Sequence, residues 1–293
     1  MKYIKILWSY FCGLIYALWL MVVPKRRLSP VTEAQHPQLV VTLTSYGRRA
    51  AKVVPHVLAS LLVQTRRPDR IILWLDNVNF SPERLPRRLA AMRDKYGVEI
   101  RFCDDIRSYK KLVPALLLCP DDILVTVDDD LLYKRRLLEC LYKAHLETPD
   151  MRLCALAHRP RFNGNCFAPY RKWTHNLVRS SAAPLFPLGG SGTLYPPHSL
   201  HADVVDKALF TSLAPQADDI WFWAMGEMAG TKTRLIDFGY PFYQVDLLYQ
   251  LLHKDASLMS SNLHEDNNDV QLKNVIGHYP ELMAKLLSQE NRP

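Results

Sequence analysis

The chain has 293 residues, of which 48% are hydrophobic and 23% charged, and its formal net charge is +8. This composition excludes a disordered chain and suits one large α/β domain or two small ones. Five basic residues precede Glu33, the first acidic residue, and subtracting them from the 37 Lys and Arg residues leaves 32 against 29 Asp and Glu, or +3. A basic N-terminus favours an anionic membrane surface as a partner, so we expect no nucleic-acid partner.

Residues 6–23 form an uncharged run between Lys5 and Pro24. As a helix this run would be about 27 Å long, slightly less than the hydrocarbon core of a bilayer. The run predicts a membrane anchor over residues 1–24, either a single span or an interfacial helix, with a linker over 25–38. A buried first helix of the following domain is the alternative. The six cysteines form no CxxC pair, which indicates reduced thiols in a cytosolic compartment and no zinc site.

Apolar strand patterns and amphipathic helix patterns alternate from residue 39 onward. This alternation predicts an α/β fold with a mostly parallel sheet and right-handed crossovers. The predicted strands are 39–43, 71–75, 98–102, 123–127 and 153–157, and the predicted helices between and after them are 51–64, 82–96, 108–118 and 133–147.

The chain changes character at about residue 158. Residues 159–165 and 184–197 are rich in loop-forming residues, with aromatic side chains between basic ones, which is typical of a binding region. A helix is predicted over 218–229, a strand over 233–238, a polar tail around 262–269 and a closing helix over 280–288.

Three consecutive carboxylates, Asp128, Asp129 and Asp130, follow the apolar strand Ile123–Val127. Ligands of α/β proteins bind beyond the carboxyl ends of such strands, and crowded carboxylates need a counter-charge. Oxygen ligands in this position suit Mg²⁺ or Mn²⁺ bridging to a phosphate. A solvated acidic turn is the alternative.

Two later motifs combine flexible backbone with acidic side chains. The glycines of Gly189–Gly192 precede no Lys-Ser/Thr pair, so they form no Walker loop, but their bare backbone permits the close approach of a sugar or phosphate. A flexible turn is the alternative. Asp218 and Asp219 begin a predicted helix that continues with Trp221 and Trp223, one of which is a candidate for stacking on a sugar ring. Helix capping over core aromatics is the other interpretation.

In their order, these motifs resemble the nucleotide-sugar-dependent glycosyltransferases of the GT-A fold, in particular the inverting family 2 type and bacterial enzymes of lipopolysaccharide and capsule assembly. The resemblance spans Val40 to Gly239. It rests on the first strand leading to Thr44-Ser45-Tyr46, the acid Asp76 at the end of the second strand, the DxD element at Asp128 and the late pair Asp218-Asp219.

The resemblance implies a role for each acid. Asp128 would contact the donor ribose and bind the metal together with Asp130. Asp129, between them, would be a further donor contact with no assigned role. Asp219, paired with Asp218, would take the proton of the acceptor hydroxyl. Further donor contacts implied by the resemblance are Thr44, Tyr46, Asp76, Asp105, Lys111 and Gly190, and His264 is a candidate third metal ligand.

Several of these assignments have open alternatives. Asp105 can cap the following helix, Lys111 can be solvated, and His264 can be a surface or core histidine. The segment Trp74-Leu75-Asp76-Asn77 departs from the acidic pair, glycine and serine that are common in family 2, so the nucleotide base stays open.

The function implied by the resemblance is the transfer of a sugar from a nucleoside-diphosphate donor, expected to be a UDP-sugar, to a glycan or lipid-linked acceptor. Residues 39–157 would bind the nucleotide sugar, and residues 158–293 would bind the acceptor. The expected location is the inner (cytoplasmic) membrane, single-pass or monotopic, with the catalytic domain in the cytosol. The alternatives are a nucleotidyltransferase of similar fold and a non-catalytic carbohydrate-binding protein.

Overall fold

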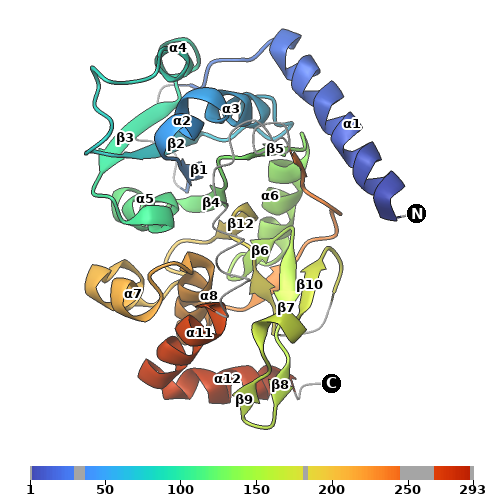
Figure 1. Cartoon of the computed structure of the whole chain (residues 1–293), viewed down its shortest axis with the longest axis vertical. Coiled ribbons are helices and arrows are strands. Elements are labelled where there is room, and N and C mark those ends of the chain that lie inside the picture. Colours follow the sequence, from blue (N-terminus) through green and yellow to red (C-terminus); the bar gives the residue numbers. More distant parts are fainter. Residues whose placement is uncertain (1, 30–36, 181–183, 245–266, 291–293) are drawn as a thin grey trace.

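The computed structural model describes residues 2–29, 37–180, 184–244 and 267–290. Its centre is a seven-stranded sheet in the order β13-β6-β12-β4-β1-β2-β3 (Figure 1). Strands β3, β2, β1 and β4 run parallel, whereas β12 runs antiparallel to both of its neighbours and β13 is parallel to β6. The predicted α/β fold with a mostly parallel sheet is confirmed. The strands are β1 Leu39–Thr44, β2 Arg70–Asp76, β3 Glu99–Cys103, β4 Ile123–Val127, β6 Arg152–Cys154, β12 Ser191–Tyr195 and β13 Thr233–Leu235.

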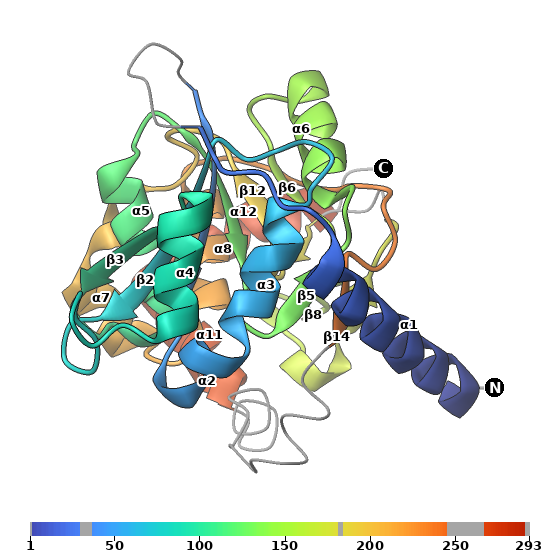
Figure 2. The same ribbon diagram turned by 90° about the horizontal axis from the view of Figure 1, so that it is seen from above.

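Helices cover both faces of this sheet (Figures 1 and 2). Strand side chains alternate between the two faces, so Val41 joins the cluster under α2, α3, α4 and α6, whereas Val40 joins the cluster under α5, α8, α11 and α12. The helices are α2 Gly47–Lys52, α3 Val54–Leu62, α4 Arg87–Tyr96, α5 Val113–Leu118, α6 Leu137–Glu147, α7 Lys207–Leu213, α8 Asp218–Met228, α11 Asn267–His278 and α12 Pro280–Glu290.

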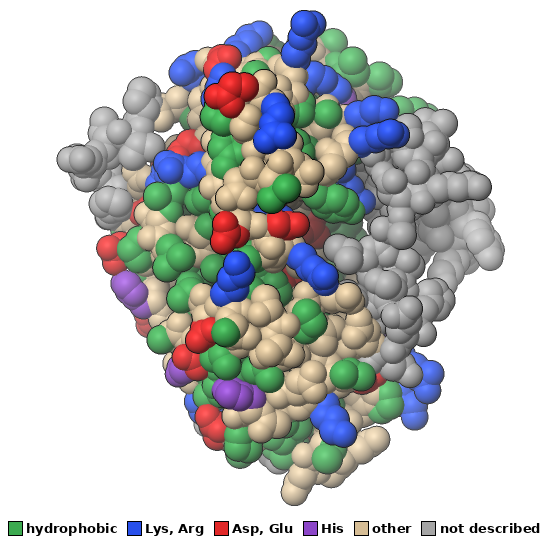
Figure 3. Space-filling model, turned by 60° about the vertical axis from the view of Figure 1, so that its left-hand side comes forward, with side chains coloured by type: hydrophobic (Ala, Val, Ile, Leu, Met, Phe, Trp, Pro, Cys, Tyr) green, Lys and Arg blue, Asp and Glu red, His purple; other side chains and the backbone are tan. Residues whose placement is uncertain are grey.

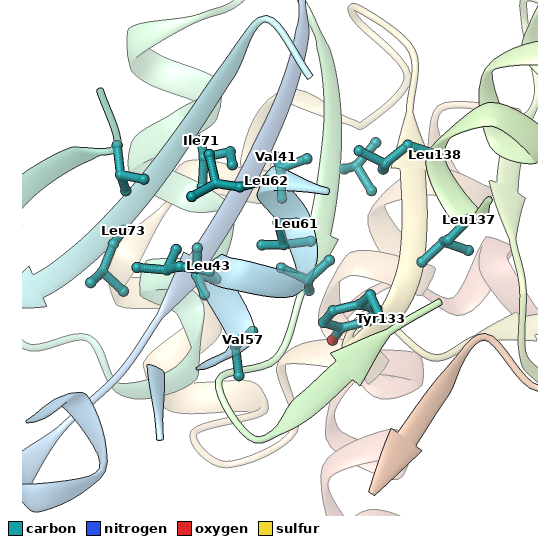
Figure 4. Packing of buried hydrophobic residues seen from close by; sticks show 14 of the residues in the cluster. Val41, Leu43, Val57, Leu61, Leu62, Ile71, Leu73, Tyr133, Leu137 and Leu138 are labelled. Carbon is teal, nitrogen blue, oxygen red and sulfur yellow. The ribbon is translucent and has the colours of Figure 1, made fainter. Parts of the chain in front are cut away.

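Figure 4 shows the first of these clusters. Val41 and Leu43 of β1 lie beside Ile71 and Leu73 of β2, and side chains of α3, among them Leu61, pack onto them. The alternating strand residues and the apolar face of α3 thus form a continuous buried layer, which holds the ends of β1 and β4 rigidly.

Smaller strands and short helices complete the fold. Strand β5 Leu131–Tyr133 pairs with β14 Phe242–Gln244, and β7 Ala157–Arg159 pairs with both β10 Thr174–Leu177 and β11 Phe186–Pro187. The remaining elements are the hairpin β8 Phe162–Asn163 and β9 Cys166–Phe167, and the 3₁₀-helices η1 Arg107–Lys111, η2 Tyr170–Lys172 and η3 Ala202–Val205.

The structure corrects several predicted elements. The helix expected over 51–64 is two helices that meet at Val53, and the helix expected over 108–118 divides into η1 and α5; in both cases a proline, Pro55 or Pro114, opens the second helix. Strand β12 lies where a loop was predicted, and α11 occupies residues 267–278, where a polar tail was predicted around 262–269. The strand expected over 153–157 is divided between β6 and β7.

The N-terminal helix α1 spans Lys2–Val22 and lies along the edge of the molecule near β5 and β14 (Figure 1). Within the described ranges, no helix combines the length and the apolar character that crossing a membrane requires. The single-span form of the predicted N-terminal membrane anchor is therefore not supported.

The face of the molecule shown in Figure 3 is mixed in chemistry, and the cysteines are unpaired. Acidic, basic and hydrophobic side chains are interspersed on the face shown in Figure 3. All six cysteines are free; Cys119 and Cys154 are buried, as expected for thiols in apolar runs, whereas Cys166 is exposed.

Candidate functional site

The candidate site lies at the carboxyl ends of β1 and β4. These strands are parallel neighbours, with Thr42 beside Thr126, so the residues that follow them emerge at the same edge of the sheet. Ser45 follows β1 and the acidic triplet Asp128–Asp130 follows β4. The edge is therefore where the fold brings polar side chains from distant segments together.

The middle and last acids of the triplet bind to the segment after β1. The Ser45 hydroxyl donates a hydrogen bond to Asp129 Oδ2 at 2.5 Å, and Arg49 Nη1 lies 3.0 Å from Asp129 Oδ1 and 3.2 Å from Asp130 Oδ2. Burial raises the pKa of Asp129, an effect that Arg49 and Ser45 oppose. The buried Asp129 thus holds α2 against the triplet, and the more exposed Asp130 faces the open edge.

Lys111 joins the triplet to the late acidic pair. Its Nζ lies 3.0 Å from Asp128 Oδ1 and 3.1 Å from Asp218 Oδ2, and only 8% of its side chain is exposed. The Thr42 hydroxyl fixes the backbone of Lys111 by donating to its carbonyl at 2.7 Å. Burial alone would lower the pKa of Lys111, but Asp128, Asp218 and Asp219 raise it well above its usual value, so the side chain stays charged.

Asp219 is the acid with the most perturbed environment in this group. Burial, followed by the negative charge of Asp218, raises the pKa of Asp219 to about 7, against the opposing charge of Lys111. Its Oδ1 accepts a hydrogen bond from the Gly189 N–H at 3.2 Å. A carboxylate with such a pKa exchanges protons near neutral pH, which suits a general base.

The glycine segment that was expected to receive a sugar or phosphate lies directly against these acids. A Cβ on Gly190 would come within 1.7 Å of Asp128 Oδ2, and a Cβ on Gly189 within 2.6 Å of Asp219 Oδ1. The bare backbone of this segment is therefore required for the approach of two carboxylates that belong to the site itself.

We expect Gly190→Ala to displace the Asp128 side chain from Lys111, because the added methyl group and the carboxylate cannot occupy the same space. The variant should lose about 1–3 kcal/mol of unfolding free energy in urea and bind Mn²⁺ more weakly. Gly277→Ala is the matched control, since no atom lies within 4 Å of its added Cβ. Equal stability and equal Mn²⁺ affinity in Gly190→Ala and the wild type would contradict the expectation.

Tyr133 fixes the loops that carry the acids. Its hydroxyl accepts a hydrogen bond from the Asp128 N–H at 2.7 Å and donates one to the Gly190 carbonyl. The ring is fully buried in the cluster of Figure 4. Strand β5 thus connects the hydrophobic core to the backbone of both Asp128 and Gly190.

Tyr133→Phe should therefore loosen the site without emptying the core. Removing a buried hydroxyl with two backbone partners should cost about 1–2 kcal/mol of unfolding free energy and weaken Mn²⁺ binding, measured by electron paramagnetic resonance titration. Tyr279→Phe is the control, because its hydroxyl donates to Asp203 Oδ2 at 2.6 Å and belongs to neither loop of the site. If both variants bind Mn²⁺ equally well, Tyr133 does not position Asp128.

The donor set of the triplet fits a hard divalent cation. Asp128 and Asp130 are partly exposed carboxylates, and Mg²⁺ commonly binds to one or two carboxylates while substrate phosphates and water complete its shell. Among the residues that the structure describes, no group of three or more His, Cys, Asp or Glu side chains is arranged to hold a metal ion. A cation here would thus depend on ligands from a substrate or water.

Other predicted site residues have local partners instead. The Thr44 hydroxyl donates to the Trp74 carbonyl at 2.9 Å, and Asp76 is buried and accepts hydrogen bonds from the backbone and side chain of Asn79. Asp105 pairs with Lys110 and accepts from the N–H of Arg107, the first residue of η1.

The remaining candidates contribute in different ways. Tyr46 is exposed and lies 5.3 Å from the Arg49 guanidinium, at the rim of the site. Trp221 and Trp223 are fully buried because these two side chains of α8 pack into the hydrophobic core. Neither can stack on a sugar ring. His264 lies outside the described residues.

Three residues of the site were not predicted from the sequence: Ser45, Arg49 and Tyr133. The dipeptide Arg48-Arg49 after the first strand is a weak sequence signal of a phosphate-binding loop. Nothing in the sequence around Tyr133 distinguishes it from an ordinary core tyrosine, because its role depends on how β5 returns beside the triplet.

Comparisons with known proteins find similar solved structures. No family model and no curated protein matches the chain. One similar solved structure is CMP:2-keto-3-deoxy-manno-octonic acid synthetase complexed with CTP. The two are 15% identical, the match covers 76% of this chain and 98% of that one, and the TM-score is 0.45.

The comparisons do not support the function predicted first from the sequence, glycosyl transfer from a nucleotide sugar: the similar solved structure is that of a synthetase complexed with CTP. The DxD spelling of the triplet does not single out glycosyl transfer, because strand-end carboxylates serve metal-bound phosphates in more than one class of transferase.

Proposed function

We propose that this chain is a nucleotidyltransferase that works with Mg²⁺ or Mn²⁺. It joins the nucleoside monophosphate unit of a nucleoside triphosphate to a hydroxyl group of a second substrate, such as a sugar, and releases pyrophosphate. The observation that carries the proposal is the convergence of Lys111 with Asp128, Asp218 and Asp219 at one edge of the sheet.

Each residue of the cluster has a task in this reaction. Asp128 and Asp130 would hold the divalent ion, which would supply Lewis-acid stabilisation of the charge on the leaving pyrophosphate. Lys111 and Arg49 are cations whose present partners are carboxylates, and they donate hydrogen bonds to phosphate oxygens when the triphosphate enters.

Asp219 receives the proton in the transfer step. The acceptor oxygen forms a bond to the α-phosphorus while the bond from that phosphorus to the oxygen bridging the β-phosphate breaks. The hydroxyl proton passes to the Asp219 carboxylate, and pyrophosphate carries away the electron pair of the broken bond. The pKa of about 7 makes Asp219 an effective acceptor of this proton near neutral pH.

The proposal is tested by product analysis. The purified chain is incubated with Mg²⁺, each of the four ribonucleoside triphosphates and a panel of sugars, and pyrophosphate is measured. We expect pyrophosphate from at least one pair, and its loss with a chelator or in Asp130→Asn. Asp121→Asn is the control, since its side chain is 71% exposed and it precedes β4, whereas the triplet follows the opposite end of that strand.

Two results would contradict the proposal. One is the absence of pyrophosphate with every triphosphate and acceptor, although the chain is folded. The other is release of a nucleoside diphosphate from a nucleotide sugar, which would indicate sugar transfer instead.

A further inference from the structure

Helix α1 presents an apolar face to solvent. Leu14, Leu18, Met21 and Val22 are 52%, 56%, 68% and 80% exposed, and their spacing places them on one side of the helix with Ile15. Exposed apolar side chains that form a continuous stripe mark a surface that binds a partner or a membrane.

The opposite face of α1 is fixed to the domain. Leu20 is buried, and Tyr16 and Trp19 pack beside it in a cluster that includes Ala59 and Leu132. The Tyr16 hydroxyl donates a hydrogen bond to the Tyr133 carbonyl at 3.0 Å. Because this face is held against the domain, α1 lies along the domain surface. The N-terminal part of the helix projects beyond the domain (Figure 2). The exposed apolar stripe therefore faces away from the domain.

A basic cavity adjoins this helix. Three consecutive cations, Lys134, Arg135 and Arg136, line a cavity of about 350 Å³ together with Tyr16 and Tyr243. Two of the cations lie against aromatic rings. The Arg135 guanidinium lies 5.4 Å from the ring centroid of Trp19, and Lys134 Nζ lies 5.1 Å from the ring centroid of Tyr243. In the described part of the chain, Arg136 pairs with Glu139, but no acidic side chain forms an ion pair with Lys134 or Arg135.

We propose that this surface docks onto an anionic lipid bilayer. Helix α1 lies in the plane of the interface with its exposed apolar residues among the acyl chains, and the cavity of Lys134, Arg135 and Arg136 receives a lipid phosphate. An apolar stripe on α1, together with several cations on the segment that packs against the same helix, matches an anionic bilayer in both respects. A second copy of the chain would bring the same cations close together, which like charges oppose.

The docking proposal does not rest on the reaction proposed above. It concerns α1 and the segment after β5, and neither Asp128 nor Asp219 takes part. Either proposal can therefore fail without the other.

Vesicle flotation of the full chain tests the proposal. We expect binding to vesicles of phosphatidylcholine and phosphatidylglycerol in equal parts, weaker binding to phosphatidylcholine alone, and weakening by salt. Arg135→Gln should reduce the partition coefficient on anionic vesicles about fivefold, which corresponds to about 1 kcal/mol for one interfacial charge. Leu18→Glu should abolish binding to both kinds of vesicle.

Matched variants separate docking from general effects. Leu146→Glu replaces an equally exposed leucine on α6, 66% exposed, and Arg171→Gln removes an exposed cation elsewhere; both should bind vesicles like the wild type. Failure of the wild type to float with anionic vesicles would overturn the proposal. The proposal would also be overturned if Leu18→Glu and Arg135→Gln floated with anionic vesicles as well as the wild type does. A third contradicting result would be a wild-type dimer in sedimentation that Leu18→Glu abolishes, with no vesicle binding by either the wild type or the variant.

Discussion

If the chain carries out the proposed nucleotidyl transfer, Asp219→Asn should lower kcat/KM for pyrophosphate release by about 10²–10⁴-fold, the range that general-base groups contribute. Asparagine keeps the shape of the side chain and an oxygen that accepts the Gly189 N–H, so the backbone of the glycine segment should not move. The loss should therefore come from the missing proton acceptor and appear in kcat rather than in the KM for the triphosphate.

The pH dependence of the wild type provides an independent readout of the same group. Only the ionised carboxylate accepts a proton, and burial and Asp218 raise the pKa of Asp219 to about 7. Activity should thus be lost as the pH falls through about 7, with kcat/KM declining about tenfold per unit below it.

The Asn variant also supplies the control for this profile. Its residual activity should lack the acidic limb, whereas Asp121→Asn should keep both the rate and the profile of the wild type. A profile that is flat from pH 5 to 8 in the wild type, or full activity in Asp219→Asn, would remove Asp219 as the base.

Lys111→Met should be the most destabilising substitution in the site. The change leaves Asp218, whose side chain is 12% exposed, without its counter-charge, whereas Asp128 is 41% exposed and can turn to water. Breaking a buried ion pair by removing one partner costs about 3–5 kcal/mol, and we expect about 3 because Asp128 is relieved by solvent. Urea unfolding measures this loss, and nucleotidyl transfer should fall below detection.

Two further variants test the cause of the loss. Lys110→Met is the matched control, because its side chain is equally buried but its partner Asp105 is 52% exposed, so the unfolding free energy should fall by only about 1 kcal/mol. The double variant Lys111→Met/Asp218→Asn should recover part of the stability, since the uncompensated carboxylate is gone. No recovery in the double variant would show that packing, not charge, causes the loss.

The sequence predicted the strands of the sheet better than the helices that cover it. The run Ile123–Val127 is strand β4 with the predicted bounds, because an apolar, β-branched run between polar neighbours strongly favours a strand buried in a sheet. The helix breaks near Pro55 and Pro114 depend on how each proline begins a new helix. Strand β12 escaped prediction because its glycines are typical of a loop, and only pairing with β4 and β6 makes Ser191–Tyr195 a strand.

For the candidate site, the order of the motifs predicted which acids meet but not what each one touches. Asp128 and Asp218 do converge, and Lys111 joins them. Asp76 closes its strand as expected, yet its side chain turns back to Asn79, a local choice that strand patterns do not encode. The role of Tyr133 follows from the position of β5, which is a tertiary feature.

The transfer of an α-labelled phosphate tests the proposed reaction most directly. Nucleoside triphosphate labelled at either the α- or the γ-phosphate is incubated with the chain, Mg²⁺ and the acceptor identified in the panel, and the products are separated. We predict that the α-label enters the acceptor product, that the γ-label leaves as pyrophosphate, and that Asp219→Asn suppresses both. Transfer of the γ-label to the acceptor, or retention of both labels in unreacted triphosphate while a nucleotide sugar is turned over, would contradict nucleotidyl transfer at this site.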